Sequence, residues 1–278
     1  MKEPEVLEKE VRAQISRTKI VGILNATPDS FYDGGRYTGL SSGLKRAGEM
    51  IAEGADIVEI GGESSRPGSR PVSGEEEKSR VLPLLEAIRS RHDLMLSVDT
   101  TKSSVAEAAL KRGAAMINDI SAGRFDPRMT EVLAACSSAD VVLMHMKGTP
   151  ETMQKNPEYG DPVEEIINFF FERIEIFEKA GISRSRIILD PGIGFGKTPE
   201  HNLEILRRLG EFKETGLRIM VGHSRKSFLG KILGRSEEER LSGTLAVSER
   251  LIEQGADFLR VHDVAPHRDL LKMMEVLR

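Results

Sequence analysis

Residues 53–60 read Glu-Gly-Ala-Asp-Ile-Val-Glu-Ile, and this stretch decides the fold. Related stretches begin at residue 112, as Arg-Gly-Ala-Ala-Met-Ile-Asn, and at residue 254, as Gln-Gly-Ala-Asp-Phe-Leu-Arg. In each of them a glycine is placed to end a helix in the left-handed conformation, and a short apolar strand follows. The recurrence predicts that helices and strands alternate along the chain.

The same order of features continues beyond these three stretches. A short apolar run is followed by a polar loop and then by an amphipathic helix, such as the one in which Val81, Leu84, Leu85 and Ile88 recur at helical spacing. The runs predicted to be strands are residues 20–24, 57–60, 94–98, 116–118, 141–144, 187–189, 218–221 and 258–261. They are apolar on both faces, which is typical of parallel strands that are covered on both sides.

Eight such units in 278 residues predict an α/β protein, a (β/α)8 TIM barrel that forms a single domain. A doubly wound open sheet is the alternative, but it usually has fewer strands, and no nucleotide-binding glycine fingerprint follows the first strand. We expect residues 1–17, which are rich in charge, to be a peripheral segment at the bottom of the barrel, and residues 18–278 to be the barrel domain.

The composition excludes several classes of protein. With 39% apolar residues, 30% charged residues, 26 glycines and 12 prolines, the chain is neither disordered nor collagen-like. Its single cysteine, Cys136, excludes an intrachain disulfide and argues against a cysteine zinc site. The net charge of −4 argues against binding along nucleic acid. No apolar run approaches the roughly 20 residues that span a bilayer, so we expect a cytoplasmic protein without a membrane partner.

Polar residues stand at the carboxyl end of every predicted strand. In chain order they are Asn25, Glu59, Glu63, Asp99, Asn118, Asp119, His145, Asp190, Ser224, Arg225, Lys226, Arg260, His262 and Asp263. The carboxyl ends of barrel strands meet at one mouth, where active sites lie. A single polar residue at such a place is explained equally well by local hydrogen bonding, but eight strands that all end this way predict a site.

The polar residues divide into two kinds of chemistry. Carboxylates and amides suit a planar heterocycle with N–H and C=O edges, and this half consists of Asp99, Asn118, Asp190 and Lys226. The other half suits a phosphate and Mg²⁺, and consists of Asn25, Ser65, Arg66, Arg260 and His262. Two long loops, residues 25–38 and 61–73, follow the first two strands, and loops of this length are usually functional. Residues 61–68 are also consistent with a surface turn.

The spacing of two other motifs excludes the functions that they suggest. Residues 192–198, Gly-Ile-Gly-Phe-Gly-Lys-Thr, do not fit the phosphate loop of nucleoside triphosphatases. Residues 222–226, Gly-His-Ser-Arg-Lys, do not fit the nucleophile motif of hydrolases, and Ser224 fits better before a helix over residues 226–233. A histidine at a strand end, such as His145, more often makes structural hydrogen bonds than takes part in catalysis.

Several stretches together resemble the dihydropteroate synthase family. Residues 21–31, Val-Gly-Ile-Leu-Asn-Ala-Thr-Pro-Asp-Ser-Phe, are similar to its first signature, and residues 56–68, Asp-Ile-Val-Glu-Ile-Gly-Gly-Glu-Ser-Ser-Arg-Pro-Gly, to its second. Further motifs follow in the family order at residues 97–100, 117–119, 144–146, 190–197, 224–227 and 260–264. Ser65 stands where some members have threonine, and it keeps the hydroxyl group.

The resemblance implies a transferase of folate biosynthesis. Such an enzyme joins (7,8-dihydropterin-6-yl)methyl diphosphate to 4-aminobenzoate and releases 7,8-dihydropteroate and diphosphate. The implied pterin site consists of Asp99, Asn118, Asp190 and Lys226. The implied diphosphate site consists of Ser65, Arg260 and His262, with Mg²⁺ held by Asn25. The implied 4-aminobenzoate site, where sulfonamides compete, consists of Phe31, Arg66, Pro67, Phe195, Lys226 and Ser227.

The expected roles follow from the same resemblance. Met144 and Gly222 complete the substrate-binding set. The expected catalytic residues are Asp99, Lys226, Arg260 and His262. The family also implies a homodimer. Two rival functions are a methyltransferase that passes a methyl group from a folate to a corrinoid protein, and a silent homologue that only binds. The first has no need of the Ser-Arg-Lys and Arg-Val-His motifs, and intact catalytic residues argue against the second.

Overall fold

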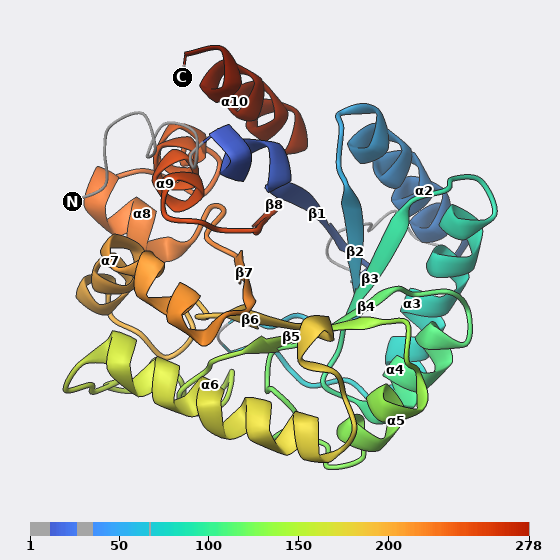
Figure 1. The fold of residues 1–278 in the computed structure, drawn as a ribbon. Helices are drawn as coiled ribbons and strands as arrows, with labels where there is room; N and C mark the ends of the chain where they lie inside the picture. Colours follow the sequence, from blue (N-terminus) through green and yellow to red (C-terminus); the bar gives the residue numbers. More distant parts are fainter. Residues whose placement is uncertain (1–11, 27–35, 67, 278) are drawn as a thin grey trace.

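Eight parallel strands form a closed barrel with helices around it in a computed structural model of the chain, which describes residues 12–26, 36–66 and 68–277 (Figure 1). The strands are β1 (Lys19–Asn25), β2 (Ile57–Gly61), β3 (Met95–Asp99), β4 (Met116–Asp119), β5 (Asp140–Met144), β6 (Ile187–Asp190), β7 (Arg218–Val221) and β8 (Phe258–Val261). Strand β1 pairs in parallel with both β2 and β8. The predicted barrel and its strands are therefore confirmed, and the open sheet is excluded.

Helices cover the outside of the barrel. They are α2 (Arg36–Ala52), α3 (Gly74–Arg89), α4 (Ser103–Leu110), α5 (Met129–Ala135), α6 (Pro162–Lys179), α7 (Pro199–Arg207), α8 (Ser227–Leu233), α9 (Leu241–Glu253) and α10 (Val264–Leu277), with 3-10 turns η2 (Arg184–Arg186) and η3 (Leu209–Thr215). No helix among the described residues is long and apolar enough to cross a membrane. Helix α8 begins one residue after the predicted start, because Lys226 has an extended backbone and caps it.

The N-terminal segment meets the barrel next to the last strand. Residues 12–17 are helical, and Ile15 is buried in the main core. The Gln14 side-chain amide donates to the carbonyl of Ala256, 2.7 Å away, just before β8 begins. Residues 1–11 lie outside the described part of the chain, so the division at residue 17 stays a prediction.

The glycines of the repeated stretches end their helices as predicted. Gly54, Gly113 and Gly255 have φ angles of +96°, +90° and +95°, a region that side-chain-bearing residues rarely adopt. Each leads directly into the strand that follows, β2, β4 or β8. Glycine at these positions therefore turns the chain from the helical layer back into the barrel.

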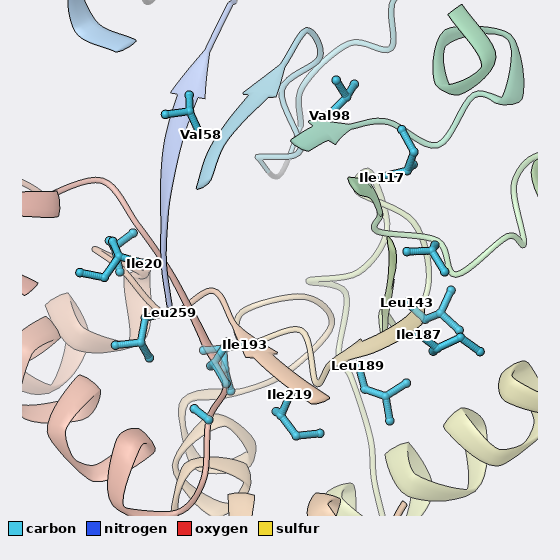
Figure 2. Packing of buried hydrophobic residues seen from close by; sticks show 14 of the residues in the cluster. Ile20, Val58, Val98, Ile117, Leu143, Ile187, Leu189, Ile193, Ile219 and Leu259 are labelled. Atoms are coloured by element: carbon cyan, nitrogen blue, oxygen red, sulfur yellow. The ribbon is translucent and has the colours of Figure 1, made fainter. Parts of the chain in front are cut away.

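The strands carry apolar side chains on both faces, and the two faces have different partners. Outward residues such as Ile20, Val58 and Leu259 belong to one large core cluster that also contains buried residues of the surrounding helices. Figure 2 shows these side chains along the strands. Inward residues form a separate cluster, made of Val21, Ile57, Met116, Val142, Ile188, Met220 and Phe258. Because side chains alternate along a strand, the next inward positions lie two residues later; four of them are polar, Glu59, Asn118, Asp190 and Arg260, and the others are Ile23, Met144 and Gly222. A layer that contains these polar side chains therefore lies directly above the apolar cluster that fills the barrel.

Helix α6 shows how the sequence builds the outer layer. Asp161 accepts hydrogen bonds from the backbone N–H groups of Val163 and Glu164, which caps the first turn. Phe170 and Phe177 belong to the apolar stripe and are fully buried, whereas Phe171 is 46% exposed. The predicted apolar stripe of this helix is confirmed, because Phe170 is buried whereas its neighbour Phe171 is largely exposed to solvent.

This contrast gives a test of the packing. We expect Phe170→Ala to lower the free energy of unfolding by about 3 to 5 kcal/mol, because it removes a buried ring and leaves a cavity. Phe171→Ala is the matched control, and its cost should stay below about 1 kcal/mol. Urea unfolding followed by circular dichroism measures both. Equal losses in the two variants would contradict this packing of α6.

Candidate active site

A pocket lies at the carboxyl ends of the strands, as the barrel fold requires of a site. Its walls are formed by Ser65, Asp99, Asn118, Ile120, Met144, Asp190, Gly192, Phe195, Gly222, Lys226 and Arg260. These residues come from separate β/α units, yet they share one space. Most of them were predicted from the sequence to bind substrate, and Ile120 and Gly192 were not.

Arg260 occupies the centre of the polar layer. Its Nε donates to the buried carboxylate of Glu59, and its Nη2 donates to Asp99 Oδ2 at 2.9 Å. Burial raises the pKa of Asp99 to about 7, although the charge of Arg260 opposes this shift. The guanidinium is therefore held between two carboxylates inside the barrel, within a layer that also carries Asn118.

Asp190 and Lys226 also line the pocket. Asp190 Oδ1 accepts the backbone N–H of Gly192 at 2.8 Å, and burial raises the pKa of Asp190 to about 6. Burial also lowers the pKa of Lys226 to about 8, with a further contribution from the charge of Arg260. The Lys226 ammonium lies 4.1 Å from the centre of the Phe195 ring, a cation–π contact.

Apolar side chains line the pocket beside these charges. Ile120, Met144 and Phe195 belong to one cluster of buried side chains and also line the pocket. Met144 is the register partner of Asp190 on the neighbouring strand. Polar acceptors and apolar side chains in one pocket suit a planar ring with N–H groups at its edge. The arrangement therefore agrees with the chemistry predicted for this half of the site.

A second depression adjoins the first one and shares Ser65, Asp99 and Ile120 with it. Its floor contains Lys102, whose ammonium is 2.6 Å from Glu63 and 2.5 Å from Glu77. Glu63 Oε2 also accepts the backbone N–H of Val72 at 3.1 Å. These contacts tie both ends of the loop that carries Ser65 to helix α3, and Ser65 itself lines both depressions.

Other predicted site residues lie around the mouth but do not line the pocket. His262 Nδ1 is 3.1 Å from Ser224 Oγ, and burial lowers the pKa of His262 to about 3, so its ring is neutral at pH 7. Arg66 is mostly exposed and pairs with Glu237 at 3.0 Å. Asn25 ends β1 beside Gly61, and Ser227 is exposed at the start of α8. Phe31 and Pro67 lie outside the described residues.

Some polar residues at strand ends make contacts within the loops and do not line the pocket, which corrects the expectation that all of them converge. Asp119 accepts the N–H groups of Ser121 and Gly123. Arg225 pairs with Asp263, and His145 lies 3.0 Å from the ammonium of Lys197. For Asp119 the physical reason is alternation, because the neighbour of an inward residue such as Asn118 must point outward. Arg225 and Asp263 lie beyond the ends of β7 and β8, so strand alternation does not direct them to the pocket.

Three residues of the site had weak signals in the sequence. Ile120 and Gly192 simply follow polar strand ends, and an apolar residue or a glycine in a loop has many explanations. Gly192 has φ +68°, and a Cβ there would lie 2.0 Å from the carbonyl oxygen of His145, so no other residue fits. Glu59 was noticed as a polar strand end, but its contacts with Arg260 become visible only when the barrel closes.

Comparison with known proteins agrees with this geometry. A profile of the pterin binding enzymes matches residues 21–262. The dihydropteroate synthase of Synechocystis is 45% identical over 262 residues, which are 94% of this chain and 90% of that protein. This chain belongs to the dihydropteroate synthase family of pterin-binding enzymes.

Solved structures of this family have the same fold. Dihydropteroate synthase from Xanthomonas albilineans with 4-aminobenzoic acid has a TM-score of 0.89 and 41% identity, and the match covers 95% of this chain and 94% of that one. The Yersinia pestis enzyme with a sulfonamide drug has a TM-score of 0.88 and 40% identity, with 95% of each chain covered. Family membership thus holds over nearly the whole barrel.

The buried carboxyl of Asp190 predicts a pH-dependent gain of stability on its removal. The pKa of Asp190 is about 6 in the folded chain and 3.8 for an ordinary aspartate, so the folded state binds the proton more tightly than the unfolded state. This proton binding stabilises the fold fully below about pH 4, and the stabilisation is lost as the pH rises through about 6. We expect Asp190→Asn, which keeps an acceptor for Gly192, to be more stable than the parent at pH 8 by up to about 3 kcal/mol. The difference should vanish near pH 4. Parallel urea-unfolding profiles across this range would contradict the prediction.

Proposed function

We propose that this chain joins (7,8-dihydropterin-6-yl)methyl diphosphate to 4-aminobenzoate, with the pterin ring in the pocket described above. The observation that carries the proposal is the convergence in one pocket of Asp99, Asn118 and Asp190, whose side-chain oxygens accept hydrogen bonds, with the apolar side chains of Ile120, Met144 and Phe195. A pterin is planar and carries an amino group and ring N–H groups along one edge. Donors on the ring and acceptors in the pocket are therefore complementary.

Relatives support the choice of substrates. A structure of the Xanthomonas albilineans enzyme is described as a complex with 7,8-dihydropteroate, and another as one with 4-aminobenzoic acid. In this chain we place 4-aminobenzoate beside the pterin, at Phe195, Lys226 and Ser227 and under the loop of Arg66. Phe31 and Pro67, which lie outside the described residues, complete that proposed subsite. Sulfonamides would compete there, as the Yersinia pestis complex with such a drug suggests.

The charges of the pocket suit the departure of diphosphate. As the bond between the pterin methylene and diphosphate breaks, positive charge grows on the methylene and negative charge on the leaving group. In the proposed mechanism Asp99 stabilises the first, and Lys226 and Arg260 stabilise the second, so catalysis is mainly electrostatic. His262 is neutral at pH 7 and would donate a hydrogen bond to the diphosphate rather than supply a charge.

The amine of 4-aminobenzoate is uncharged at neutral pH and can attack the methylene without a strong base. We therefore assign no general base. The segments that follow β1 and β2, predicted from the sequence to be long loops over residues 25–38 and 61–73, would exclude water, which otherwise captures the cation. The ion pairs of Lys102 with Glu63 and Glu77 support this role by fixing the base of the second loop. The first prediction was too long, because helix α2 begins at Arg36.

Mg²⁺ is proposed as the cofactor, because the donors at the mouth fit it in part. Asn25 offers an amide oxygen, a hard ligand that Mg²⁺ accepts, and this oxygen faces Gly61 next to Asp99. Within the described part of the chain there is no group of three or more His, Cys, Asp or Glu side chains that could hold a metal by themselves. Such a site fits an ion bound mainly by diphosphate and water, which would neutralise the leaving group.

Two further proposals rest on the resemblance and on the composition. We propose that the enzyme is a homodimer, as the resemblance to the family implies, and that it acts in the cytoplasm. Sedimentation equilibrium measures the first, and a monomer at micromolar concentration would contradict it.

The central assay follows diphosphate release. Release should require the pterin diphosphate and should rise when 4-aminobenzoate and Mg²⁺ are added. Asp190→Asn should weaken pterin binding at least about tenfold, because a charged acceptor is lost from the pocket. Asp140→Asn is the matched control, since Asp140 starts β5 at the other end of the barrel, where it pairs with Arg218. No release by the wild-type chain, or methyl transfer to a corrinoid protein instead, would refute the proposed function.

The magnesium site has its own test. We expect Asn25→Ala to raise the Mg²⁺ concentration for half-maximal activity about tenfold, because one protein ligand is removed. Binding of a pterin without diphosphate should not change, since Asn25 does not line that pocket. An unchanged Mg²⁺ requirement would show that Asn25 is not a ligand.

A further inference from the structure

The carboxylate of Glu59 lies beneath the pocket and makes contacts with three other strands. Glu59 stands on β2, is 0% exposed and does not line the pocket itself. It accepts hydrogen bonds from Ser97 Oγ on β3 at 3.0 Å, from Asn118 Nδ2 on β4 at 3.2 Å and from Arg260 Nε on β8. All three of these partners donate, and one of them is a guanidinium, so both carboxylate oxygens serve as acceptors.

This carboxylate dictates which way the amide of Asn118 points. An ionised carboxylate can only accept hydrogen bonds, so Asn118 must turn its NH₂ group toward Glu59. The opposite orientation would bring two acceptor oxygens together in a buried place. The carbonyl oxygen Oδ1 consequently points away from Glu59, and it is buried without a hydrogen-bond partner among the described residues. An orphaned buried acceptor has a free-energy cost that a ligand donor would remove.

We propose that Glu59 is a positioning residue that sets the hydrogen-bond polarity of the pocket floor. It makes Asn118 present an acceptor to the ligand, beside the acceptors Asp99 and Asp190. It also holds Arg260 through Nε while Nη2 reaches Asp99. The pocket is thereby selective for a ring edge that is rich in N–H donors. This inference rests on the proposed function, because it assumes that the ligand is a pterin.

A charge-preserving swap tests the orientation directly. One carboxylate oxygen, Oε1, accepts from both Asn118 and Arg260, so a glutamine would keep its oxygen there, and an apolar replacement is the informative one. In Glu59→Leu no acceptor remains at position 59, so the amide of Asn118 is free to turn over and face the pocket with NH₂. In the double variant Glu59→Leu with Asn118→Asp, the carboxylate at position 118 offers an acceptor oxygen to the ligand whichever way it turns. The total charge of the pair stays the same as in the wild type. Ser97→Ala is the matched control, because it removes a buried hydrogen bond to the same carboxylate without changing charge or amide orientation.

The measurement is calorimetric titration of each folded variant with 7,8-dihydropterin, with circular dichroism as the check of folding. We expect Glu59→Leu to weaken binding about ten- to a hundredfold, Ser97→Ala less than about threefold, and the swap variant to recover most of the loss. If Glu59→Leu does not fold, the swap variant alone decides, and recovery to within about fivefold of wild type supports the proposal.

Binding by Glu59→Leu as tight as wild type would overturn the inference, as would a folded swap variant that binds no better than Glu59→Leu. Both outcomes leave the proposed function intact, provided that the wild type binds the pterin. A wild-type protein that does not bind 7,8-dihydropterin would instead refute the proposed function and, with it, the inference.

Discussion

The contact of Arg260 with Glu59 and Asp99 is the constraint on which the site depends. Charged groups inside a barrel are stable only if they are paired and hydrogen-bonded, and these three residues pair across β8, β2 and β3. They rest on an apolar layer that includes Val21 and Phe258 and seals the barrel below them. The pocket can therefore be both highly charged and closed at its floor.

In the same arrangement the protein only partly offsets the free-energy cost of burying the charged and polar groups of the pocket. Burial raises the pKa values of Asp99 and Asp190 and lowers that of Lys226, so each charged form is disfavoured where it stands. Asn118 Oδ1 has no partner within the described chain. A ligand with N–H donors and an anionic group would relieve these costs, which links the substrate chemistry to the stability of the site. Functional sites commonly trade stability in this way.

The sequence alone was sufficient for the barrel and for most of the pocket. Short apolar strands after glycines such as Gly54 determine the alternation, and strand ends converge in any closed barrel. The direction of individual side chains was harder to predict. Asn118 and Asp119 are adjacent and both polar, yet one faces the pocket and the other holds its own loop. Arg66 pairs with Glu237, 171 residues away, and no local pattern predicts such a contact.

The most direct test is a crystal structure of the chain with 7,8-dihydropterin bound. We predict that the ring lies between Arg260 and Met144 and that its N–H groups reach Asn118 Oδ1 and the Asp190 carboxylate at hydrogen-bond distance. A ring bound outside this pocket, or one that turns acceptors toward these oxygens, would contradict the account.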